Sequence, residues 1–425
     1  MGEKKRSLAA AFGAISSTLE ILSGDQIVYD DVPRLYFAGR GGRAVVKGLD
    51  NIDRFREAVT DVWHGDPALY YGFTRKRVEG QIVQIFRDVA RRGRAATLED
   101  LKDGVRDLRD KPTQSYEVFR PAWGCSLSGH ISTLGPYTVY SWPRDRDTIL
   151  SNYPRMEEAD QALRWSSDPD PKVLVSIRVD AKEPDRAMEL ADPVFFRFEN
   201  LLRFIIHDSE GLEDVSLLGF EAPGGEQAAA LTRTPSGSTW QSKWSARGPI
   251  RDLDLSTPTF QSDPAHVWLW TAAAAPTPTD LQRRVLTAVD WIGRGLRDRH
   301  SGKQFVQYAL ALESLLQIDE KDPFRPSTTS QLAEYAAFLL GSDYEERTAI
   351  EKRIRQIYGR RSAVVHGRSA EVQGDDLGDL FGYLVRLIET FCTHPELCQI
   401  KDFTAVREWV QVQKYGGGPP PARPL

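Results

Sequence analysis

The feature that most constrains this chain is a series of apolar stripes at helical spacing, which begins shortly after Pro278. Within each stripe the apolar residues recur every three or four positions, so they lie on one face of a helix. The stripes occupy residues 281–292, 305–316, 332–339, 350–357 and 377–391. A helix cannot bury its own apolar face, and these helices can therefore cover one another only as a bundle. The fourth is predicted to break at Gly359.

The chain before the stripes mixes strand and helix signals. Residues 137–142 and 172–179 are rich in aromatic and β-branched side chains, which favours strands, and residues 194–205 return to helical spacing. Residues 224–237 are rich in Gly, Ala, Ser and Thr and predict a loop. Between the prolines that follow, residues 267–270 predict a last short strand.

These signals predict an α+β protein. We expect an N-terminal mixed α/β domain over residues 1–275, of one or two subdomains, followed by an all-α bundle over residues 276–411. The remainder, residues 412–425, is rich in Gly and Pro and is expected to be a disordered tail.

Composition narrows the classes of function. The 425 residues include 55 Lys and Arg against 60 Asp and Glu, for a net charge of -5, so any contact with nucleic acid has to be local. Three cysteines imply no disulfide framework and a reducing compartment. No apolar run approaches the ~18 residues of a membrane span, and residues 1–22 fit an amphipathic helix better than a signal peptide. We therefore expect a soluble, cytoplasmic protein with no membrane partner.

The strongest local signal lies at the end of the fourth stripe. Residues 351–368 contain six basic residues and one acidic residue, in a chain that is acidic overall. A run of this kind is most often a solvated helix face. Here, however, His366 follows two valines, and Arg361 precedes it by five residues, so in a helix both side chains point to roughly one side.

An arginine and a histidine on one side of a segment suit the cleavage of an RNA phosphodiester. An imidazole such as that of His366 takes the proton from a 2′-hydroxyl, or protonates the leaving oxygen, near neutral pH. A guanidinium such as that of Arg361 holds phosphoryl oxygens through two hydrogen bonds as charge builds on them. Such a pair needs neither a metal nor a cofactor, and we expect none.

Three sequence blocks resemble a known family. The HEPN superfamily of helical domains carries an arginine and a histidine separated by four to six residues, and Arg361 and His366 match with four between them. The string YGRRSAVVHG that contains them, the earlier ALALESLL and the still earlier AVDWIGRGL are similar to the HEPN domain of the ApeA-like group, in the expected order. Arg294 and His300 share the spacing but lack that context.

The resemblance implies a metal-independent endoribonuclease that cuts RNA by attack of the 2′-hydroxyl, leaving a 2′,3′-cyclic phosphate and a 5′-hydroxyl. HEPN nucleases usually form homodimers, in which two Arg–His pairs meet in one groove. By position, Arg361 is the phosphate-binding arginine and His366 the catalytic histidine. Glu313, in the ALALESLL block, is placed to orient one of them, or else is an exposed helix carboxylate.

The residues around the pair supply further expectations. Ser362 follows the arginine, where many active family members have Asn, Asp or His, and it still offers a hydroxyl for hydrogen bonding. Arg360 and Arg368 are expected to extend the RNA-binding groove or to lie solvated at the surface.

The resemblance also places the protein in anti-phage defence, through abortive infection or a toxin–antitoxin pair. Because an unrestrained RNase would harm its own cell, the N-terminal domain is expected to sense a phage-derived or small-molecule trigger and to restrain the nuclease by a population shift. The alternative is a non-catalytic HEPN module for dimerisation or nucleic-acid binding. Ser362 and the net acidic charge favour this alternative.

One further cluster suggests a metal. Cys392, His394 and Cys398 are three soft ligands near the end of the last stripe, but their spacing matches no standard zinc site and no fourth ligand is adjacent. We expect no metal there, and Cys392 is predicted to belong to the core.

Overall fold

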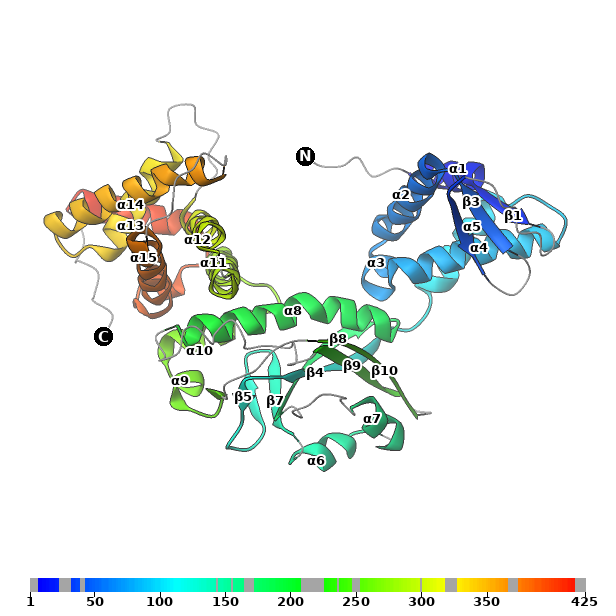
Figure 1. The fold of residues 1–425 in the computed structure, drawn as a ribbon, viewed down its shortest axis with the longest axis horizontal. Coiled ribbons are helices and arrows are strands. Elements are labelled where there is room, and N and C mark those ends of the chain that lie inside the picture. Colours follow the sequence, from blue (N-terminus) through cyan, green and yellow to red (C-terminus); the bar gives the residue numbers. More distant parts are fainter. Residues whose placement is uncertain are drawn as a thin grey trace.

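A computed structural model gives the fold of the chain. The described residues are 7–22, 32–38, 43–142, 144–153, 156–163, 172–207, 225–234, 237–246, 253–298, 300–317, 327–365 and 374–416. Only the backbone is described at residues 156, 225–234, 237–246 and 362–365. The protein is α+β: a region that mixes helices and strands precedes a region that is helical (Figure 1).

The chain up to Arg109 is a small α/β unit with a core of its own. Its elements are α1 (Leu8–Thr18), β1 (Leu19–Leu22), β2 (Arg34–Phe37), β3 (Arg43–Lys47), α2 (Leu49–Gly65), α3 (Pro67–Gly72), α4 (Arg75–Arg91) and α5 (Leu98–Arg109). The strands form an antiparallel sheet in the order β1-β3-β2. The helices and this sheet enclose apolar side chains that run from Ala11 to Leu108, and these form a cluster separate from the rest of the protein.

The next part is built on a six-stranded antiparallel sheet in the order β10-β9-β4-β8-β7-β6. Its elements are β4 (Gln114–Ala122), β5 (Cys125–Ser126), β6 (Ser132–Leu134), β7 (Tyr137–Ser141), α6 (Arg146–Leu150), α7 (Met156–Ala162), β8 (Val173–Ala181), α8 (Pro184–Ile205), β9 (Gly225–Thr234), β10 (Gly237–Ala246), β11 (Leu253–Asp254), α9 (Pro258–Gln261) and α10 (Pro264–Ala274). The short strands β5 and β11 pair in parallel beside it.

Helices cover both faces of this sheet (Figure 1). Alternate residues of a strand point to opposite faces, so Tyr116 and Val118 of β4 join the core beneath α8. Phe119 of β4 joins a smaller cluster with α6 and α7 on the other face. There the carboxylate of Glu117 accepts hydrogen bonds from nearby hydroxyls, including that of Tyr153 at 2.6 Å.

Two expectations for this part were wrong. Residues 224–237 were expected to form a loop, but 225–234 form β9, which pairs with β10 and with the central strand β4. The small side chains suggested a loop. The backbone of this segment is instead paired with neighbouring strands, and such pairing cannot be read from the sequence of the segment alone. Residues 267–270 were expected to form a strand but lie inside α10, because Asp263 caps the helix and Pro264 occupies its first turn.

The C-terminal part consists of helices that pack on one another, as the stripes predicted. They are α11 (Asp280–Arg297), α12 (Ser301–Leu316), α13 (Thr328–Leu340), α14 (Tyr344–Val365), α15 (Gly374–Thr393), the short 3₁₀ helix η2 (Leu397–Gln399) and α16 (Phe403–Lys414). The predicted break at Gly359 was wrong, since α14 continues through this exposed glycine. α16 ends at Lys414, past residue 411, where the bundle was expected to end.

None of the helices in the described part of the chain combines the length and the apolar character that crossing a bilayer requires.

The helix α8 joins the sheet and the bundle into a single core. One apolar cluster runs from β4 through α8 and α11 to α16. Helices α8 and α11 approach closely at Gly293 of α11. A Cβ added there would lie 2.5 Å from the Cβ of Asn200 of α8 and 2.6 Å from its Cα. Beside this contact, Arg197 of α8 pairs with Asp290 of α11 at 2.8 Å. The bundle therefore is not a separate body on a linker.

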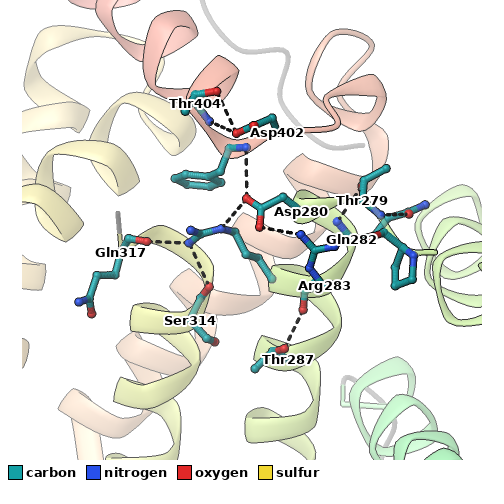
Figure 2. Close-up of polar contacts among 12 residues, drawn as sticks. Thr279, Asp280, Gln282, Arg283, Thr287, Ser314, Gln317, Asp402 and Thr404 are labelled. Atoms are coloured by element: carbon teal, nitrogen blue, oxygen red, sulfur yellow. Dashed lines mark hydrogen bonds and ion pairs between the residues drawn. The ribbon is translucent and has the colours of Figure 1, made fainter. Parts of the chain in front are cut away.

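The ends of several bundle helices meet around Asp280 of α11 (Figure 2). Arg284 donates from Nε to the Asp280 carboxylate at 3.0 Å and from Nη1 to the carbonyl of Gln317, at the end of α12, at 2.6 Å. The same carboxylate accepts the backbone N–H of Phe403, the first residue of α16, at 3.3 Å. The last turn of α12 is thus fixed against α11 and α16.

The N-terminal unit docks on the start of α8. Thr74 donates its backbone N–H and its hydroxyl to the carboxylate of Glu183, at 2.6 and 2.8 Å. The guanidinium of Arg186 lies over the rings of Trp63 and Tyr70, 5.0 and 4.8 Å from their centres. These polar contacts link the unit to α8 although their apolar cores are separate.

Replacing Gly293 by alanine should destabilise the protein, because the new methyl group overlaps the backbone of Asn200 and forces α8 and α11 apart. Overpacking costs about 1–3 kcal/mol, and each 1 kcal/mol shifts the melting temperature of a domain by about 2–4 °C. Circular dichroism should show melting several degrees lower. The control is Gly378→Ala on α15, where nothing lies within 4 Å of the added Cβ. Equal melting temperatures for the two variants would contradict the close packing of α8 on α11.

Candidate functional site

The helix α14 turns Arg361 toward the interior of the bundle. Ile350, Ile354 and Ile357 are buried at helical spacing, and Arg361 lies four residues beyond the last of them, on the same face. That face packs against α12. The apolar face of α14 that packs in the core therefore also brings Arg361 against α12.

Glu313 of α12 receives this arginine. The Nε of Arg361 lies 2.8 Å from Oε1 of the carboxylate, and Nη2 donates a hydrogen bond to Oε2 at 3.1 Å. The sequence left open whether Glu313 orients a site residue or is an exposed carboxylate. Its side chain is 17% exposed, and it contacts Arg361 across 48 positions of the chain.

Tyr358 is a third member of the site that the sequence analysis did not single out. Its hydroxyl donates to Oε1 of Glu313 at 2.7 Å, and the guanidinium of Arg361 lies 5.7 Å from the centre of its ring. Burial raises the pKa of Tyr358, and the hydrogen bond to Glu313 and the charge of that carboxylate raise it further. The hydroxyl therefore stays protonated and remains a donor at physiological pH.

The pairing leaves part of the guanidinium available. Glu313 occupies the edge formed by Nε and Nη2, while Nη1 of Arg361 has no hydrogen-bond partner among the described residues. The side chain is 31% exposed. A guanidinium carries five N–H donors, so Arg361 is held on one edge and can donate to an oxyanion from another.

Arg360 has a different environment. Its Nη1 bonds the carboxylate of Asp376, in the first turn of α15, and Arg353 reaches the same carboxylate at 3.0 Å. The side chain of Asp376 is 2% exposed. Arg353 also pairs with Asp379 at 2.6 Å. The sequence analysis did not identify Asp376 and Asp379, although their position shortly after the basic segment was a usable signal. They fasten α15 to α14.

The remaining predicted site residues are only partly described. The backbone at Ser362 is helical, as the last turns of α14 continue to Val365. His366 and Arg368 lie outside the described residues. Arg361 and Glu313 are thus the predicted site residues that the structure brings together, and Arg360 lies beside them on α14 with Asp376 as its partner.

The second arginine and histidine with HEPN-like spacing lie elsewhere. Arg294 stacks over the rings of Phe196 and Trp291, at 5.0 and 4.7 Å from their centres. His300 is the exposed residue that precedes α12. Arg294 differs from Arg361 in that it lies over two aromatic rings and makes no ion pair with a carboxylate among the described residues.

The cluster at the end of α15 has structural contacts. Cys392 is buried, and burial raises the pKa of its thiol well above the usual value. The Nδ1 atom of His394 accepts backbone N–H groups of Glu396 and Leu397. Within the part of the chain that the structure describes, no three His, Cys, Asp or Glu side chains are arranged to hold a metal ion.

Comparisons of the chain with protein families, with curated proteins and with solved structures find no match. The similarity to HEPN domains therefore stays a prediction from the sequence blocks.

Replacing Asp376 by asparagine should destabilise the bundle, because two arginines lose a buried anionic partner. Breaking a buried ion pair costs about 3–5 kcal/mol, and partial exposure of the arginines lowers the expected cost to roughly 2 kcal/mol. The melting temperature should fall by several degrees. The matched control is Asp375→Asn, one residue earlier in the same helix turn but exposed. If Asp376→Asn and Asp375→Asn have the same melting temperature, Asp376 does not fasten α15 to α14.

Proposed function

We propose that this protein is a metal-independent endoribonuclease of the HEPN type, with Arg361 and His366 as its reacting pair. The observation that carries the proposal is the contact of Glu313 with Arg361 and Tyr358. It joins two of the three HEPN-like sequence blocks, ALALESLL and YGRRSAVVHG, around the arginine on which the family resemblance depends.

The strength of the ion pair suits an arginine that must also bind substrate. A partly exposed pair contributes roughly 0.2–1 kcal/mol, whereas a donor to a developing oxyanion supplies about 3–4 kcal/mol in the transition state. Glu313 can therefore orient Arg361 without outcompeting a phosphate. The free Nη1 and the shared Nη2 of the guanidinium are the donors for phosphoryl oxygens.

The proposed reaction is an intramolecular transesterification. A general base takes the proton of the 2′-hydroxyl, the 2′-oxygen forms a bond to phosphorus, and the bond from phosphorus to the 5′-oxygen breaks as that oxygen receives a proton. His366 performs these proton transfers. Arg361 stabilises the negative charge on the phosphorane. In a homodimer, the second copy of the pair would complete the groove, and Arg368 of each copy would add phosphate contacts.

We place this activity in defence against phage, with the region before α11 as sensor of a phage-derived or small-molecule trigger. The shared core of sheet, α8 and α11 supports a restraint that acts through packed helices. A change in the docking of the N-terminal unit would reach α8 through Glu183 and Arg186.

A specific observation favours the second candidate, a non-catalytic module. Arg360 and Arg361 are each paired with an acid of the same chain, which reduces the local positive charge available to RNA. In this case the contact around Glu313 would serve only the packing of α12 and α14, and the protein would bind RNA or dimerise without cutting.

The test is cleavage of total RNA by the purified full chain in the presence of EDTA. The wild type should cut and His366→Ala should lose at least about 100-fold in rate, since general acid–base catalysis contributes about 10²–10⁴-fold. The control is His300→Ala, which removes the exposed histidine of the other Arg–His spacing and should cut like the wild type.

Equal cutting by His366→Ala and the wild type would exclude the proposed histidine. No cutting by any variant, together with RNA binding that Arg361→Ala loses and His366→Ala retains, would favour the non-catalytic module.

A further inference from the structure

Tyr358 and Arg361 share one carboxylate, and this sharing has a chemical consequence. Both lie on the same face of α14, three residues apart, and both reach Glu313 of α12. The tyrosine hydroxyl and the Nε of the arginine approach the same oxygen, Oε1, at 2.7 and 2.8 Å, while Nη2 approaches Oε2 at 3.1 Å.

The hydroxyl limits how Glu313 can hold the arginine. A carboxylate offers about four lone-pair sites over two oxygens. Oε1 accepts from Tyr358, and the N–H at Nε makes no aligned hydrogen bond although its nitrogen lies 2.8 Å from the same oxygen. Only Nη2 makes an aligned bond to Glu313. The guanidinium is therefore held at a fixed place but not engaged in a symmetric two-pronged pair.

We infer that Tyr358 is a positioning residue for the proposed RNA cleavage: its hydroxyl fixes the Glu313 carboxylate, which in turn holds the guanidinium of Arg361 in place with Nη1 open to a phosphate. The inference rests on the proposed function and adds a residue to it. Without the hydroxyl, the Glu313 carboxylate loses the hydrogen bond at Oε1 that fixes it, and the guanidinium that it holds is placed less precisely against the phosphate. Misplacement by about 1 Å can cost up to ~10²-fold in rate.

The ring of Tyr358 has a separate role that the test can isolate. It lies under the guanidinium and is half-buried against the bundle core. Tyr358→Phe keeps this ring and removes only the hydroxyl. The matched control is Tyr383→Phe on α15, also half-buried, whose hydroxyl makes no hydrogen bond among the described residues.

The experiment is a double-mutant cycle between Tyr358→Phe and Arg361→Ala in the full chain, with two readouts. The first is the affinity for a mixed-sequence 2′-O-methyl RNA, which lacks the 2′-hydroxyl and cannot be cut by the proposed route. Tyr358→Phe should weaken this affinity about threefold when Arg361 is present and leave it unchanged when residue 361 is alanine. The second is cleavage of unmodified RNA, where Tyr358→Phe should lower kcat about tenfold, more than it lowers affinity.

Each outcome bears on the positioning role of Tyr358, on the proposed nuclease, or on both. Equal losses of affinity from Tyr358→Phe with and without the arginine, or losses equal to those of Tyr383→Phe, would overturn the inference and leave Tyr358 a packing residue. A wild type that binds RNA but does not cut it would overturn the proposed nuclease, while the affinity cycle would still establish or refute the positioning of Arg361. A wild type that neither binds nor cuts RNA would overturn both.

Discussion

The contact of α8 with α11 is the constraint on which the rest of the structure depends. With one face α8 covers the six-stranded sheet, and with the other it meets α11 at Gly293, where only a glycine lets Asn200 approach. The sheet and the bundle therefore share one core, and a fragment that began at α11 would expose apolar surface that α8 covers. The N-terminal unit, by contrast, has its own core and touches the start of α8 through polar and stacking contacts. The contacts at Glu183 and Arg186 link this unit to α8, which in turn packs on the bundle.

Two neighbouring arginines of the site differ in how deeply their acidic partners are buried. Consecutive residues of a helix point roughly 100° apart, so Arg360 faces α15 and Arg361 faces α12. The partner of Arg360, Asp376, is almost fully buried and shared with Arg353, which makes the pairing part of the fold. The partner of Arg361 is more accessible and already bonded to Tyr358. The second arrangement holds the guanidinium of Arg361 on one edge and leaves its Nη1 without a hydrogen-bond partner among the described residues.

Much of the bundle followed from periodicity, because the stripes from Leu281 to Phe391 are long and each has a single apolar face. Short segments were less predictable. Residues 267–270 are apolar enough for a strand, yet the cap at Asp263 makes them helical, and β9 is a strand because β4 lies beside it. In the site, the sequence suggested Arg361 and Glu313 through a family resemblance. It could not show that they meet, or that Tyr358 joins them, because such contacts depend on how α12 packs on α14.

The chemistry of the RNA ends tests the central claim most directly. Wild-type full chain would be incubated in EDTA with an end-labelled RNA, and the new termini would be analysed by mass spectrometry and by their response to polynucleotide kinase. Attack by the 2′-hydroxyl predicts a 2′,3′-cyclic phosphate on one product and a free 5′-hydroxyl on the other. Products with a 3′-hydroxyl and a 5′-phosphate would contradict it, because they arise when the bond from phosphorus to the 3′-oxygen breaks, whereas attack by the 2′-hydroxyl breaks the bond to the 5′-oxygen.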